Sequence, residues 1–212
     1  LTTWGGIGVG NEINLNIYSE SLDKDKMGKM TVTGAPENCP GIGSGMNTSS
    51  TVLIAGGNIT AKGGEFGAGI GSSLGSDSDC YVTITNGIVD ATGGDHGAGI
   101  GSGGNNGYAS VRIYGGTVTA IGGGCGAGIG GGGSSTDYSP GGHCAVYIFS
   151  GNVTAIGGSN GAGIGSGYEG SCTVFIYGGN ITANCGSNSA DIGSGCNGSC
   201  NGEITGGNIK GG

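Results

Sequence analysis

The pentapeptide Gly-Ala-Gly-Ile-Gly occurs four times in this chain, and shorter variants of it precede and follow the intact copies. The intact copies cover 67–71, 97–101, 126–130 and 161–165, and the variants cover 5–8, 40–43 and 189–193. The central isoleucines are 28 to 35 residues apart, as in the steps from Ile42 to Ile70 and from Ile7 to Ile42. A period of this length predicts a stacked repeat architecture, in which each unit buries its apolar face against its neighbours.

Each repeat contains three short segments that are apolar at every second position. Val82-x-Ile84 represents the first segment, Val89-x-Ala91 the second, and the Ala-x-Ile of the pentapeptide the third. Alternation with a period of two predicts strands with one buried face, and Gly-Gly pairs such as 93–94 predict the corners between them. We therefore expect an all-β chain without helices.

The expected fold is a right-handed parallel β-helix (β-solenoid) of about seven coils, as one domain over 1–212. Three strands per coil predict three parallel sheets, because stacked coils lie about 4.8 Å apart and hydrogen-bond strand to strand. The right hand follows from the strong preference of parallel crossovers. The two longest steps contain extra residues at 19–29 and 131–143, which we expect to project from one edge of the stack.

Composition narrows the function classes. The chain has 212 residues, of which 58 are glycine and 9% are charged, and it has no Gly-X-Y period of collagen. Its net charge is −8, and Arg112 is its single arginine, so nucleic acid is not an expected partner. No apolar run reaches membrane-spanning length, and no membrane span is expected.

Eight cysteines indicate an oxidising, extracellular or cell-surface location. Four of them share one position, two residues before the first strand's first inward residue, and Ala109 interrupts this column. Neighbours in such a column lie within disulfide range. The disulfide candidates are Cys80, Cys144, Cys172, Cys185, Cys196 and Cys200.

The acidic residues do not form the pair that glycoside hydrolysis requires, and the single arginine does not suit lyase chemistry. The run 75–79 lacks the ligand spacing of an EF-hand. Neither His96 nor His143 has an evident partner. We therefore predict a non-enzymatic protein with no catalytic residue, no metal site and no cofactor.

The outward positions of the first strand carry five aromatic rings and one arginine over three successive coils. An exposed aromatic patch of this kind is typical of a surface that binds sugar rings or protein, and the alternative is that the 131–143 insertion covers it. The patch consists of Arg112, Tyr114, Tyr147, Phe149, Phe175 and Tyr177.

The outward positions of the second strand form a polar ladder that resembles those of ice-binding solenoids, although Asp90 and Lys210 interrupt it. Its members are Asn58, Thr60, Thr117, Thr119, Asn152, Thr154, Asn180 and Thr182. Three of these asparagines, with two others, also stand in Asn-x-Ser/Thr sequons, which predict N-glycosylation in a eukaryotic secretory context. The five sequon positions are Asn47, Asn58, Asn152, Asn180 and Asn197.

The third strand has Ala and Ile inward and almost only glycine outward. This pattern has two interpretations, a bare face that another backbone approaches and a consequence of tight coiling. The two ends of the chain also complement each other, because the last residues supply a second strand and the first residues supply the third strand that follows it. This predicts either a slice of a longer repeat protein or head-to-tail polymerisation, with end-to-end contacts at Trp4, Ile7, Ile204 and Ile209.

The repeated string GG-N-I/V-T-A-x-GG-x-x-GAGIG, from about Thr51 to Gly195, resembles the glycine-rich repeats of secreted and cell-surface β-helix proteins with a pectin-lyase-like fold. The resemblance implies the fold and leaves the activity open, since such proteins differ widely in function. The leading hypothesis is an extracellular structural or adhesive solenoid that associates with itself, head to tail or laterally. The alternatives are a carbohydrate-binding module that uses the aromatic patch and an ice-binding protein that uses the polar ladder.

Overall fold

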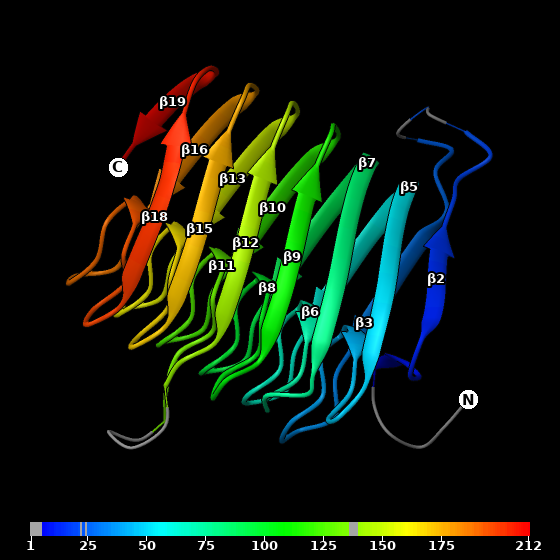
Figure 1. Cartoon of the computed structure of the whole chain (residues 1–212). Helices are drawn as coiled ribbons and strands as arrows, with labels where there is room; N and C mark the ends of the chain where they lie inside the picture. Colours follow the sequence, from blue (N-terminus) through cyan, green and yellow to red (C-terminus); the bar gives the residue numbers. More distant parts are fainter. Residues whose placement is uncertain (1–5, 22, 24, 136–139) are drawn as a thin grey trace.

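The protein is a right-handed parallel β-solenoid of about six turns in the computed structural model, which describes residues 6–21, 23, 25–135 and 140–212. None of the described residues is helical. The strands stack side by side along one axis, with the first described residues and the C-terminal residues at opposite ends of the stack (Figure 1). The predicted fold class is confirmed, and the number of complete turns is slightly smaller than expected because the end coils are partial. Trp4 lies outside the described residues.

The strands fall into the three predicted sets, and every pairing between neighbouring coils is parallel. The first set contains β2 (Ile13–Ile17), β5 (Ser49–Lys62), β7 (Asp79–Thr92), β9 (Tyr108–Ile113), β12 (His143–Ile148), β15 (Ser171–Ile176) and β18 (Ser199–Ile204). The second set contains β3 (Lys29–Thr33), the latter halves of β5 and β7, β10 (Thr117–Ile121), β13 (Asn152–Ile156), β16 (Asn180–Asn184) and β19 (Asn208–Gly211). The third set contains β1 (Ile7–Val9), β4 (Ile42–Ser44), β6 (Ile70–Ser72), β8 (Ile100–Gly101), β11 (Ile129–Gly130), β14 (Ile164–Gly165) and β17 (Ile192–Gly193).

The expectation of three separate sheets is wrong, because the first and second sets belong to one 12-stranded sheet. The third set forms its own 7-stranded sheet. The first two sets merge at β5 and β7, each of which continues through the corner for 14 residues. A bridge between Ala55 and Asn86 carries the ladder across this corner with a register shift on either side. In the later coils the strand ends before the corner glycines and a new strand begins after them.

The core consists of columns of identical or similar side chains along the axis. The valines at 52, 82, 111, 146 and 174 are in register and are almost completely buried. The largest fully buried side chains are all isoleucines. Each such burial contributes about 1.5–3 kcal/mol. Repetition of one β-branched shape at one position lets every coil pack on the next in the same way.

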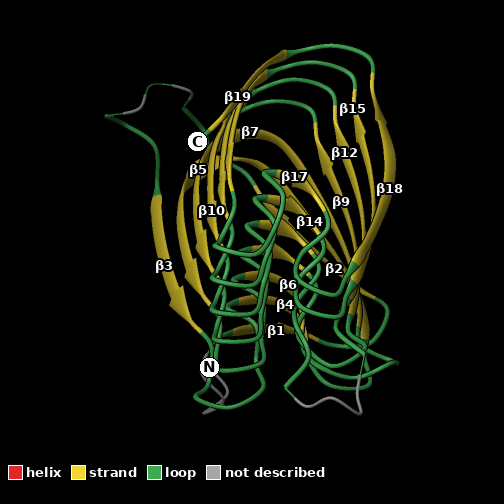
Figure 2. Cartoon of the chain, turned by 90° about the vertical axis from the view of Figure 1, so that its left-hand side faces the viewer, coloured by secondary structure: helices red, strands yellow, loops and turns green. Residues whose placement is uncertain are grey.

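The third strands are shorter than expected, and both of their sides are buried. Ala68 precedes β6 and is buried, but it is not among the side chains of the main core, whereas Ile70 is. The short strands lie between two columns of loops (Figure 2). These loops are joined from coil to coil: the amide of Gly104 donates to the carbonyl of Phe66 at 2.9 Å, and that of Gly133 to the carbonyl of His96 at 2.7 Å.

The glycines of the inner third strands, such as Gly71 in β6, are required by close approach of the neighbouring coil. Gly71 is buried and has φ +144°, a backbone conformation that residues other than glycine rarely adopt. A Cβ on Gly71 would lie 1.8 Å from the carbonyl oxygen of Gly101. The interpretation as tight coiling is therefore correct, and the expected bare outward glycine face is not present.

A column of buried serines follows the pentapeptide and joins successive coils. Ser72, Ser102 and Ser166 are fully buried, and each hydroxyl accepts a hydrogen bond from a backbone amide of the next coil, at Gly103, Gly132 and Gly195. The distances are 2.9 to 3.1 Å. The sequence analysis missed this column, although the serine recurs at a constant position after Gly-Ile-Gly.

The two insertions lie at different corners, so the expectation that they project from one edge is wrong. Residues 19–28 follow the first strand β2 and precede the second strand β3, where Met27 is buried and Lys26 pairs with Asp23 at 3.5 Å. Residues 131–142 follow the third strand β11 and precede β12. The steps between isoleucines give the length of an insertion, but they do not show at which corner it leaves the stack.

Candidate functional surfaces

Outward side chains on β9, β12 and β15, and on the residue that directly follows each of these strands, form two columns of stacked groups. In one column the Arg112 guanidinium lies 5.1 Å from the centre of the Tyr147 ring, which stacks on Phe175 at 5.5 Å. The register pairs these three residues directly. We call this column together with its neighbour, Tyr114, Phe149 and Tyr177, the aromatic ladder. All six predicted patch residues therefore lie together.

The second column of the aromatic ladder is exposed. Phe149 stacks on Tyr114 at 4.6 Å and on Tyr177 at 5.0 Å, with interplanar angles of 2° and 18°. All three rings are more than a third exposed. The described residues of the 131–143 insertion contact neighbouring loops instead, since Gly133 donates to His96 and Gly141 donates to Glu169. Because Phe149 has a stacked ring on each side, mainly its edges are open to solvent.

A second group of polar and aromatic residues, which the sequence analysis did not single out, gathers where β7, β9 and β12 begin. Asp79, Tyr108 and His143 are in register, and with Tyr81, Ser76 and Asn106 they line an open hollow of about 640 Å³, which we call the polar groove. The rings of Tyr81 and Tyr108 lie 6.4 Å apart at 64°. These two rings meet edge to face rather than face to face, and Tyr81 is 41% exposed.

Partial burial shifts the pKa values of two groups in the polar groove. Partial burial, and then the neighbouring Asp77, raise the pKa of the Asp79 carboxyl. Burial also raises the pKa of the Tyr108 hydroxyl. His143 Nδ1 hydrogen-bonds the hydroxyl of Ser171 on the next coil. The signal in the sequence was the constant offset of Asp79, Tyr108 and His143 from the first inward valine of each coil.

The polar ladder on the second strands has the predicted register. Asn152 pairs with Asn180 and Thr154 with Thr182, and the Asn180 amide donates to the Asn152 side-chain oxygen at 3.0 Å. Thr117 and Thr119 continue the ladder by one coil. Beyond them stand Ile88 and Asp90, and only then Asn58 and Thr60. The ladder therefore runs without interruption over three coils, and ice binding stays a prediction.

The cysteine column is also in register, but all eight cysteines are free thiols. Cys144 pairs with Cys172 and Cys172 with Cys200, whereas Ala109 separates Cys144 from Cys80. Cys185 is exposed and Cys196 is half-buried. The structure gives the expected disulfides no support, and their formation stays a prediction.

The sequon asparagines differ in exposure. Asn47, Asn152, Asn180 and Asn197 are exposed, and Asn58 is half-buried. Asn47 and Asn197 have φ of +56° and +55°, a left-handed conformation that asparagine adopts in turns. Their glycosylation stays a prediction.

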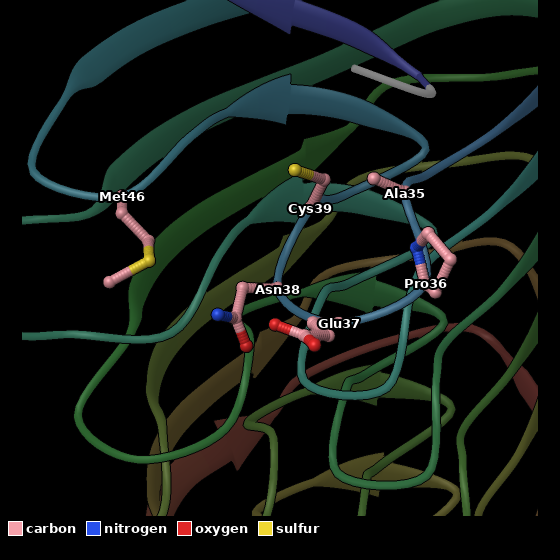
Figure 3. Close-up of a pocket in the computed structure, with 6 residues that line it drawn as sticks. All are labelled: Ala35, Pro36, Glu37, Asn38, Cys39 and Met46. Carbon is pink, nitrogen blue, oxygen red and sulfur yellow. The ribbon is translucent and has the colours of Figure 1, made fainter. Parts of the chain in front are cut away.

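An apolar hollow of about 480 Å³ lies at the corner after β3. The loop 35–39 and the side chain of Met46 face one another across it (Figure 3). Glu37 contributes its one carboxylate, and Asn38 and Cys39 contribute an amide and a thiol. This set lacks a second acid for acid–base chemistry. No group of three or more His, Cys, Asp or Glu side chains in the described part of the chain is placed to hold a metal ion.

The two end coils expose apolar side chains that equivalent coils bury. At the N-terminal end Ile13 is 54% exposed, and at the C-terminal end Ile204 is 50% exposed. Ile7 and Ile209 pack partly against the core. Gly202 occupies the position in β18 that valine occupies in the preceding coils, and a hollow of about 220 Å³ lies beside it.

These observations define the protein as a parallel β-solenoid whose surfaces are built from side-chain columns. Comparison with family models agrees: a Beta helix repeat model matches residues 52–75, 82–104, 111–133 and 146–168. Each match begins at the first inward valine of a coil, and the matches together with the fold support a β-helix repeat protein. Neither the curated proteins nor the solved structures contain a match. The described residues form no helix that is long and apolar enough to cross a membrane.

Proposed function

We propose that this protein is a non-enzymatic, extracellular structural or adhesive solenoid that lengthens by stacking coil on coil, the N-terminal coil of one copy on the C-terminal coil of another. The observation that carries the proposal is the complementary shape of the two end coils. The extracellular location is supported by the eight cysteines and the low charge content.

The columns of the core define the register of such a stack. Leu15 and Gly202 are the two ends of one inward column, whose other members are the valines of the intervening coils. A second copy in the same register places Leu15, which is larger than valine, over Gly202 and the hollow beside it. The Leu15 side chain of one copy would thus fill the space left by the missing side chain of Gly202 in the next copy.

The neighbouring columns support the same register. Ile17 and Ile204 are the ends of a second inward column, and Ile13 and Cys200 are the ends of a third. Stacking would cover Ile13 and Ile204, which are each about half exposed. Full burial of one such side chain contributes about 1.5–3 kcal/mol. The edges of β18 and β2 that pair with no described strand would also gain backbone hydrogen bonds.

The test compares the purified chain with two single-charge variants by sedimentation and negative-stain microscopy. Leu15→Asp puts a carboxylate in the inward column, whereas Asn14→Asp adds the same charge to the outward face of the same strand. We expect the parent chain and Asn14→Asp to form rods that lengthen with protein concentration, and Leu15→Asp to stay monomeric with a β-rich circular dichroism spectrum. Monomers of the parent chain at every concentration, or normal rods of Leu15→Asp, would refute the proposal.

A second candidate function, binding of polysaccharide, is favoured by one observation in the polar groove. Sugars stack on exposed rings, and Tyr81 is 41% exposed, is not stacked face to face on Tyr108, and lies beside hydrogen-bonding groups of Asp79 and Asn106. The aromatic ladder supports this function less, because Tyr114 and Tyr177 stack on the two faces of its central ring, Phe149. Glycan-array binding that Tyr81→Ala abolishes and Tyr177→Ala leaves intact is the expected result. The reverse pattern would place binding on the aromatic ladder, and binding retained by both variants would exclude the two surfaces.

A further inference from the structure

Three cysteines occupy successive positions of one inward column. Cys144 on β12, Cys172 on β15 and Cys200 on β18 are direct register partners. Neighbouring strands lie about 4.8 Å apart, within the Cα separation of about 4.4–6.8 Å that disulfides span. Cys80 belongs to the same column but is two coils from Cys144, about 9.6 Å on the same spacing, which no disulfide spans.

The central thiol lies between its two neighbours in the column. The side chains of Cys144 and Cys200 both influence the pKa of Cys172, whose thiol donates to the carbonyl of Thr173 at 3.7 Å. Cys144 and Cys172 are 5% exposed, whereas Cys200 is half-buried and lines the hollow at the C-terminal end. A reagent in solution can therefore reach Cys200 first.

We propose that Cys172 is the shared half of one exchangeable disulfide, which it forms with either Cys200 or Cys144 while the third cysteine stays a free thiol. Three thiols in one line allow a single bond, and each of the two adjacent pairings includes the central residue. The oxidant is a small-molecule disulfide such as oxidised glutathione.

The chemistry balances as two successive exchanges. The Cys200 thiolate attacks the small disulfide, forms a mixed disulfide and releases one small thiolate. The Cys172 thiolate then attacks the Cys200 sulfur and releases the second small thiolate. The two cysteines lose two electrons and two protons, and the small disulfide becomes two thiols. Attack of Cys144 on the Cys172 sulfur would then move the bond inward and free Cys200, with no net oxidation.

Burial slows this chemistry and makes it depend on pH. The side chain of Cys144 and burial raise the pKa of the Cys172 thiol, and the side chain of Cys172 and burial raise that of Cys200. Since the thiolate is the nucleophile, we expect oxidation to accelerate from pH 7 to pH 9.

The test uses serine variants, because Ser50 already occupies this column in a buried position and shows that the column accepts serine. The parent chain, Cys144→Ser, Cys172→Ser, Cys200→Ser and the control Cys80→Ser are incubated with oxidised glutathione, alkylated and mapped by peptide mass spectrometry. We expect a 172–200 bond in Cys144→Ser, a slower 144–172 bond in Cys200→Ser, and no bond within the column in Cys172→Ser. Cys80→Ser should match the parent chain.

Three results would overturn the proposal: a 144–200 bond in Cys172→Ser, a bond from Cys80 to any column member, or no bond within the column in the parent chain at either pH. Circular dichroism of each variant, compared with the parent chain, distinguishes lost pairing from lost folding.

Discussion

Substitution of Gly71 by alanine tests whether the glycine columns hold the coils together. The Cβ of alanine would lie 1.8 Å from the Gly101 carbonyl oxygen, and Cβ atoms essentially never come within 3.0 Å of another atom. The two coils would therefore have to separate by at least 1.2 Å at this point, the difference between the two distances. A displacement of this size breaks the short hydrogen bonds between the third strands.

The expected loss of stability follows from two contributions. A side chain at φ +144° costs about 1–3 kcal/mol. Two hydrogen bonds beside this contact run from the Gly69 amide to Ala98 and from the Ile70 amide to Gly99, each at 3.0 Å. Each is worth about 0.5–1.5 kcal/mol, so the total loss is about 2–6 kcal/mol. Since domains are stable by about 5–15 kcal/mol, Gly71→Ala should be severely destabilised.

Two glycines of the same column provide the controls. Gly193 has φ +141°, but a Cβ there would meet only the Ala190 side chain, at 3.2 Å, so Gly193→Ala should lose about 1–3 kcal/mol from the backbone alone. A Cβ on Gly8 would meet no atom within 4 Å, and Gly8→Ala should be neutral. Urea denaturation followed by circular dichroism measures all three. A loss below about 1 kcal/mol in Gly71→Ala, or equal losses in Gly71→Ala and Gly193→Ala, would refute the reasoning.

Two further predictions concern the surfaces. Phe149→Ala removes two stacked contacts, each worth about 0.5–1.5 kcal/mol, and should cost about twice as much in urea denaturation as Tyr114→Ala, which removes one; equal costs would contradict a role for stacking. Asp79→Asn should raise the melting temperature at pH 7 and lose this advantage near pH 3. The folded-state pKa of Asp79 is raised above its ordinary value, so ionisation of the carboxyl destabilises the fold as pH rises through that pKa. Melting curves from pH 3 to pH 7 check this, and an unchanged melting temperature at pH 7 would contradict it.

The columns were predictable because a repeat converts sequence offset into position. Cys172 and Cys200 share one offset from the core valine position of their coils, as do Tyr147 and Phe175, and the structure pairs both sets. The polar groove follows the same rule, but its residues come from three different coils and differ in type. Asp79, Tyr108 and His143 therefore show no recurring motif, although they occupy one column.

The orientation of the rings was not predictable. The offset places Phe149 between Tyr114 and Tyr177 but does not determine whether the rings meet by their faces or by their edges. Packing of side-chain rotamers in the folded protein decides this. It produces parallel rings in the aromatic ladder and nearly perpendicular rings at Tyr81 and Tyr108.

The sequence by itself determined the period, the three strands of each coil, the inward columns of valine and isoleucine, and the register of the outward residues. All of these depend on local alternation and on a constant repeat length. Only the tertiary structure decided that two strand sets merge into one sheet and that the third strands lie between two columns of loops. It also decided that the last glycine of Gly-Ala-Gly-Ile-Gly lies in close contact with the neighbouring coil. These features depend on atoms about 30 residues apart in the chain that come together only after the coils have stacked.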